Sequence, residues 1–123
     1  MRRIAVIVDF AFVLLFIVIG RSAHHHGLSL GGVVSTTWPF AVGLAVGWLV
    51  LVVTRRSGVS LSSGAAVVAV TVAVGMILRV IAGQGTAAAF ILVALAFLGL
   101  MLLGWRILYT VISSRVSRER TRT

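Results

Sequence analysis

The sequence predicts an all-α polytopic membrane protein in which four transmembrane helices form an up-down-up-down bundle with both termini in the cytoplasm. Of its 123 residues, 60% are hydrophobic and only 11% are charged. The mean hydropathy of +1.18 lies outside the range of soluble globular domains. Four apolar runs occupy most of the chain, at residues 4–20, 38–54, 65–82 and 87–112. They leave no room for a soluble domain, so we expect residues 1–123 to form a single transmembrane domain.

The basic residues predict the orientation. All eleven are arginines, and the formal net charge is +9. If the N-terminus is cytoplasmic, eight of them fall on the cytoplasmic side: Arg2, Arg3, Arg55, Arg56, Arg115, Arg118, Arg120 and Arg122. Only Arg21 then falls in an outer loop, so the positive-inside rule predicts a multi-pass protein of the cytoplasmic (inner) membrane, with residues 113–123 as a basic cytoplasmic tail. Because topology accounts for the charge, we expect no nucleic-acid partner.

The first apolar run contains an acid. Residues 4–20 cover about 25 Å as a helix, close to the hydrocarbon thickness of a bilayer. Asp9 lies inside this run. A carboxylate at the centre of a bilayer costs about 2.5 to 3.5 kcal/mol on insertion scales, so it is retained only with a partner or a function. Two interpretations remain open, a paired structural acid and a proton relay.

The second and third runs carry small residues at helical spacing. Pro39, Gly43 and Gly47 recur every four residues, and a GxxxG step permits close helix packing. We place Pro39 in the first turn of its helix, where a missing N–H is tolerated, with Thr36 or Thr37 as the cap. Thr71 and Gly75 repeat the pattern in the third run. We expect packing within the bundle, with a homodimer interface as the alternative.

The fourth run supplies a partner for the acid. Arg106 lies six residues before residue 112, about 9 Å inside the cytoplasmic boundary, and Asp9 lies about 7 to 8 Å inside the same boundary. The first and last helices of an up-down-up-down bundle are neighbours. We therefore predict an intramembrane ion pair between Asp9 and Arg106.

Short motifs along the chain resemble a known family. They are an acid in the first helix, then GRxxH, WPF, TxxxGMxxR, FILV and GWR. In this order they resemble the uncharacterised bacterial and archaeal membrane proteins grouped as domain of unknown function family 3054. The resemblance picks out Asp9, Gly20, Arg21, His24, Pro39, Phe40, Thr71, Gly75, Arg79, Phe90, Trp105 and Arg106. It implies a membrane protein and supplies no activity.

Basic residues near the outer face form a candidate ligand site. Arg21 and His24 follow the first span, and Arg79 ends the small-residue pattern of the third. Guanidinium groups bind carboxylate or phosphate with paired hydrogen bonds, so these residues predict an anion or lipid-headgroup site. The alternative is that each arginine extends from a helix end to the interface. His24, His25 and His26 are consecutive and have no nearby acid or cysteine, so we expect no metal site and no cofactor.

The function expected first is recognition or movement of an anionic small molecule or lipid headgroup by a protein embedded in the lipid bilayer. The second is an accessory subunit that packs against a larger membrane partner, and the third is a proton-coupled small transporter that uses Asp9. One intramembrane acid, no lysine and no cysteine do not assemble a catalytic site, so we do not expect an enzyme.

Overall fold

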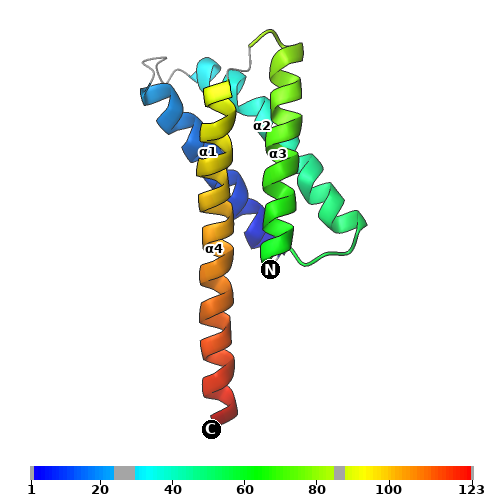
Figure 1. The fold of residues 1–123 in the computed structure, drawn as a ribbon, viewed down its shortest axis with the longest axis vertical. Helices are drawn as coiled ribbons and strands as arrows, with labels where there is room; N and C mark the ends of the chain where they lie inside the picture. Colours follow the sequence, from blue (N-terminus) through cyan, green and yellow to red (C-terminus); the bar gives the residue numbers. More distant parts are fainter. Residues whose placement is uncertain (1, 24–29, 85–87, 123) are drawn as a thin grey trace.

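The computed structural model describes residues 2–23, 30–84 and 88–122, and the main-chain structure of these residues is helical apart from short connections (Figure 1). The helices are α1 (Arg2–Ala23), α2 (Leu30–Val53), α3 (Leu61–Ile81) and α4 (Ala88–Arg122). Each is long and apolar enough to cross a membrane, and the described residues contain no strand. The expectation of an all-α protein with four transmembrane helices is confirmed.

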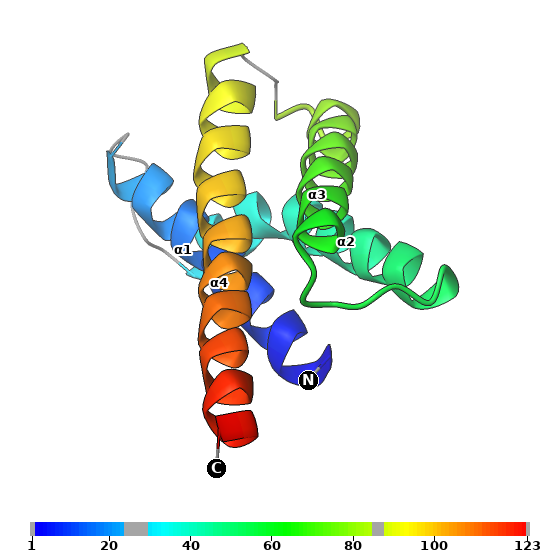
Figure 2. The ribbon, with the colours of Figure 1, turned by 60° about the horizontal axis from the view of Figure 1, so that its bottom comes forward.

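The four helices contact one another in chain order. α2 packs against α1 and α3, α3 packs against α4, and α1 packs against α4. Successive helices run in opposite senses in Figure 1. α1 and α2 lie obliquely to α4 in both ribbon views (Figure 2). The contact between α1 and α4 brings residues from the two ends of the chain together.

The start of α2 differs from the prediction. The helix begins at Leu30, so Pro39 lies in its interior and not in its first turn, and the expected cap at Thr36 or Thr37 is wrong. A proline has no N–H to donate to the carbonyl four residues earlier, here that of Ser35. The side chain of Gln84 replaces it, because its Nε2 donates to the Ser35 carbonyl at 3.0 Å.

The end of α4 also differs. The predicted span ends at residue 112, but the helix continues without a break to Arg122. Its 35 residues rise about 52 Å, well beyond a hydrocarbon layer of about 30 Å. Residues 107–120 are exposed on every side, and Figure 1 shows this part of α4 extending past the other three helices.

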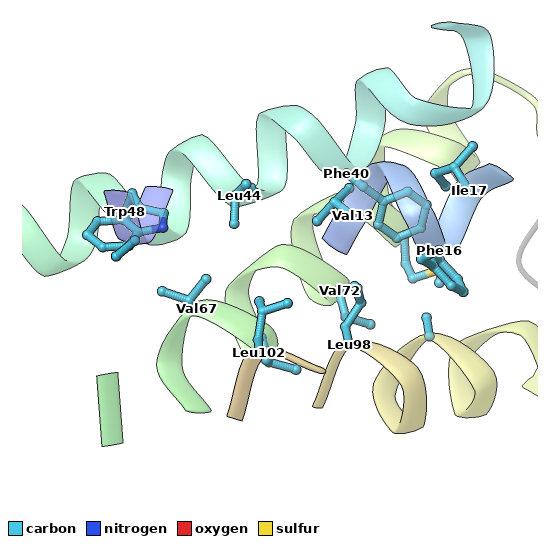
Figure 3. Packing of buried hydrophobic residues seen from close by; sticks show 14 of the residues in the cluster. Val13, Phe16, Ile17, Phe40, Leu44, Trp48, Val67, Val72, Leu98 and Leu102 are labelled. Carbon is cyan, nitrogen blue, oxygen red and sulfur yellow. The ribbon is translucent and has the colours of Figure 1, made fainter. Parts of the chain in front are cut away.

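Apolar side chains from all four helices fill the core (Figure 3). Four phenylalanines meet at one level, where Phe16 lies with its ring centroid 5.9 Å from that of Phe40, 5.8 Å from that of Phe90 and 5.6 Å from that of Phe97. Between these rings and Trp48 lie further apolar side chains, those of Val13, Leu44, Val67, Val72, Leu98 and Leu102.

The small residues of α2 and α3 pack against one another within the chain. A Cβ at Gly43 would lie 2.5 Å from the carbonyl oxygen of Thr71, and one at Gly75 would lie 2.7 Å from Cδ1 of Phe40. Backbone and ring therefore occupy the space that larger side chains would need. At Gly47 the added atom would make an ordinary contact, 3.4 Å from Cα of Val67. These contacts are the intramolecular packing that we expected for this pattern.

Candidate functional site

The carboxylate of Asp9 lies at the centre of a buried polar cluster. Arg106 donates to both of its oxygens, from Nη1 at 2.9 Å and from Nη2 at 2.7 Å. The indole N–H of Trp48 donates to Oδ2 at 3.0 Å, and that of Trp105 donates to Oδ1 at 2.9 Å. Asp9 and Arg106 are both fully buried. The predicted ion pair is thus present in the structure, in its bidentate form and with two further donors.

The guanidinium of Arg106 has further acceptors on other parts of the chain. Its Nε donates to the carbonyl of Gly58 at 3.1 Å, and its Nη1 donates to the carbonyl of Leu102 at 3.0 Å. Its Cζ also lies 4.6 Å from the centre of the Trp105 ring, in a cation–π contact. A buried charge is tolerated when it is paired and its polar atoms are hydrogen-bonded, and this one meets both conditions.

Two glycines make room for the cluster. A Cβ at Gly58, in the connection between α2 and α3, would lie 2.5 Å from Cη2 of Trp48. A Cβ at Gly64, in the first turn of α3, would lie 2.6 Å from Cδ of Arg106. The connection can therefore lie directly on the indole, and the arginine can pass close to α3. The Asp9 cluster, which we define as Asp9, Trp48, Gly58, Trp105 and Arg106, joins α1, α2, the α2–α3 connection and α4.

Neither tryptophan and neither glycine was assigned to this cluster from the sequence, although Trp105 is among the residues that the family resemblance picks out. One signal was present for Trp48, which lies six residues before the end of the predicted second span and so at nearly the depth of Asp9. Trp105 directly precedes Arg106, but neighbouring helical positions point about 100° apart, so adjacency alone does not indicate a shared partner.

The other end of the bundle holds two arginines that are linked to α2. Nη1 of Arg21 donates to the hydroxyl of Thr36 at 2.8 Å. Nη1 and Nη2 of Arg79 reach the side-chain and main-chain oxygens of Gln84, each at 3.3 Å. Gln84 in turn bonds the carbonyl of Ser35. Arg21 and Arg79 are therefore linked to neighbouring residues of α2, the first directly and the second through Gln84.

Burial and charge distinguish this end. Arg21 and Arg79 are both half-buried, and the guanidinium carbon of Arg79 lies 4.4 Å from the centre of the Phe90 ring. The chain has only two acidic residues. Asp9 is bonded to Arg106 and precedes Arg21 by twelve residues, about 18 Å along α1, while Glu119 lies near the far end of α4. Neither acid neutralises the two arginines.

One residue of the predicted ligand site, His24, lies outside the described residues. The structure adds Thr36 and Gln84 to the set, and it also brings Thr37 to this end. Thr37 is only 7% exposed, and its hydroxyl has no hydrogen-bond partner in the described part of the chain. We define the Arg21–Arg79 site as Arg21, Thr36, Arg79 and Gln84.

Fold and site together define a class, that of small multi-pass membrane proteins whose first and last helices are joined by a buried ion pair. The chain belongs to the family described as "Protein of unknown function (DUF3054)", whose model matches residues 6–109. The match includes both ends of the bundle, from Asp9 to Arg106, and confirms the resemblance. A search of curated proteins and a search of solved structures found no match.

Proposed function

We propose that this membrane protein binds an anionic group, a phosphate or a carboxylate, at the Arg21–Arg79 site. The observation that supports the proposal is that two half-buried guanidinium groups are linked to adjacent residues of α2, Arg21 directly to Thr36 and Arg79 through Gln84 to Ser35. Neither acid of the chain extends to this end of the bundle. Guanidinium groups hold carboxylate and phosphate through charge-assisted paired hydrogen bonds, and burial strengthens those bonds.

The neighbours of the two arginines preorganise them. Thr36 orients Arg21, while Gln84 and the Phe90 ring orient Arg79. Preorganised groups lose less rotamer freedom when a ligand binds. The site lies where α1 and α3 end. Helices of this length end near the boundary of the hydrocarbon layer, so the two arginines are within reach of lipid phosphates.

The proposed orientation places both termini in the cytoplasm and the Arg21–Arg79 site on the outer side of the cytoplasmic membrane. It rests on the eight arginines that gather at the opposite end. Outer-leaflet lipid phosphates and anionic solutes share the chemistry that the site accepts. The proposed function is recognition of a phosphate or carboxylate group. That group belongs either to a bound lipid or to a solute that is held at the site before it is transported.

The two other candidate functions have different support. The four donors on Asp9, two of them from a bidentate arginine, favour a structural acid over a proton carrier. An accessory role is supported by Gly99 and Gly104 of α4, where an added Cβ would meet nothing within 4 Å. A partner helix or a second copy could approach α4 closely there.

The test is a binding titration of the purified protein in mild detergent with three probes: short-chain phosphatidylglycerol, short-chain phosphatidylcholine and inorganic phosphate. Arg79→Gln should weaken binding of the anionic probe about tenfold or more, because one charge-assisted contact is lost. Arg120→Gln removes the same charge from the far end of α4 and should change nothing.

The probes separate the two sources of the anion. Binding of phosphatidylglycerol alone identifies a lipid site, and binding of both phosphatidylglycerol and inorganic phosphate identifies a site for small anions. If neither binds, or if Arg79→Gln and Arg120→Gln act equally, the proposal is wrong and the arginines serve only as interfacial charges.

A further inference from the structure

The extension of α4 reaches past the membrane. Arg79 lies over Phe90, which puts Phe90 at the level where the Arg21–Arg79 site meets the headgroups. A hydrocarbon layer of about 30 Å takes about 20 helical residues, so α4 leaves it near Thr110. Arg115 then lies about 7 to 8 Å beyond the hydrocarbon, and Arg118 lies about 12 Å beyond it. The headgroup layer is about 5 to 8 Å thick on each side.

The direction of each side chain follows from helical spacing. On α4 the positions buried against the bundle are Ala94, Leu98, Leu102 and Arg106, four residues apart. Arg120 is fourteen positions after Arg106, close to four full turns, so it lies on the same side of the helix.

Arg118 lies on the opposite side. It is eighteen positions after Leu100, which is five full turns, and Leu100 is 69% exposed. Ile107 and Val111 share this face and are also exposed. Arg115 follows Val111 by one turn. The apolar face that α4 turns to the lipid thus continues directly into a basic face.

We propose that Arg115 and Arg118 bind the phosphates of anionic lipids in the leaflet that borders this end of the bundle. Arginine side chains are long enough to reach back from these depths to the phosphate level. The leaflet expected here is the cytoplasmic one, where anionic lipids attract basic residues beside a membrane helix. The contact holds the extension of α4 at the membrane surface.

The experiment measures backbone hydrogen exchange of residues 113–120 in lipid nanodiscs of phosphatidylglycerol and of phosphatidylcholine. Both leaflets of each disc have the same composition, so orientation does not affect the result. We expect exchange in the anionic discs to be slower by about fivefold for each arginine that binds, and this difference should fall as salt rises.

Arg118→Gln and Arg120→Gln form the matched pair, because they remove equal charge two residues apart on opposite sides of α4. Arg118→Gln should reduce the difference between the two lipids, the double variant Arg115→Gln/Arg118→Gln should abolish it, and Arg120→Gln should preserve it. Equal exchange in both lipids for the wild type, or equal effects of Arg118→Gln and Arg120→Gln, would overturn the proposal.

Discussion

Removing one member of the buried ion pair should destabilise the protein strongly. In Asp9→Asn the side chain keeps one acceptor oxygen but turns an N–H₂ group toward N–H donors, so up to two of the four hydrogen bonds are lost. The charge of Arg106 is then left buried among carbonyls. Breaking a buried pair in this way costs about 3 to 5 kcal/mol. Arg106→Gln should cost a similar amount, because Asp9 keeps only the two indole donors.

The double variant Asp9→Asn/Arg106→Gln tests whether these losses have one cause. Both replacement side chains are neutral, so neither leaves a stranded charge, and the combined loss should fall short of the sum by about 2 kcal/mol or more. The assay is equilibrium unfolding in mixed micelles, with the free energy of unfolding measured for all four proteins. Arg120→Gln controls for the removal of a positive charge outside the cluster. Additive losses would show that the two charges act independently and would refute the structural role given to the pair.

Three other experiments test separate features of the protein. Trp105→Phe keeps the ring beside Arg106 but removes one donor to the Asp9 carboxylate, so we expect a loss of about 1 to 3 kcal/mol in the same assay. Gly43→Ala should cost about 1 to 3 kcal/mol because its Cβ would meet a main-chain oxygen, whereas Gly99→Ala, which meets nothing within 4 Å, should be close to neutral. Of two reporters fused after residue 123, the one that functions in the cytoplasm should be active and the one that functions in the periplasm should be inactive. Activity of the periplasmic reporter would contradict the proposed orientation.

The four transmembrane helices could be predicted from the sequence because each crossing of the membrane needs about 20 apolar residues, and only four runs of the chain qualify. Their ends were harder to predict, because a helix can continue beyond the hydrocarbon where composition gives no signal. Residues 113–122 are polar apart from Val116 and yet extend α4. Pro39 lies inside α2 because Gln84, 45 positions later, bonds the carbonyl that proline leaves without a donor. No local pattern contains that contact.

The Asp9–Arg106 pair was predictable for a specific reason. The chain has a single acid inside its spans, and a depth argument leaves one arginine at the same level. Tryptophans near span ends are common at any membrane interface, so the positions of Trp48 and Trp105 did not assign them to the carboxylate of Asp9. Gly58 and Gly64 matter only because Trp48 and Arg106 approach them in the folded chain, and such proximity is a property of the tertiary structure.

The most direct test of the proposed function is native mass spectrometry of the protein extracted from its own membrane in mild detergent. The wild type and Arg120→Gln should both retain an anionic molecule, a lipid or a smaller solute, of the same mass and in the same proportion. Arg79→Gln should retain less of it, because only anionic lipid held at Arg115 and Arg118 would then remain. Retention of that molecule by Arg79→Gln at the wild-type level, or a wild type that carries no anionic molecule, would contradict anion binding at the Arg21–Arg79 site.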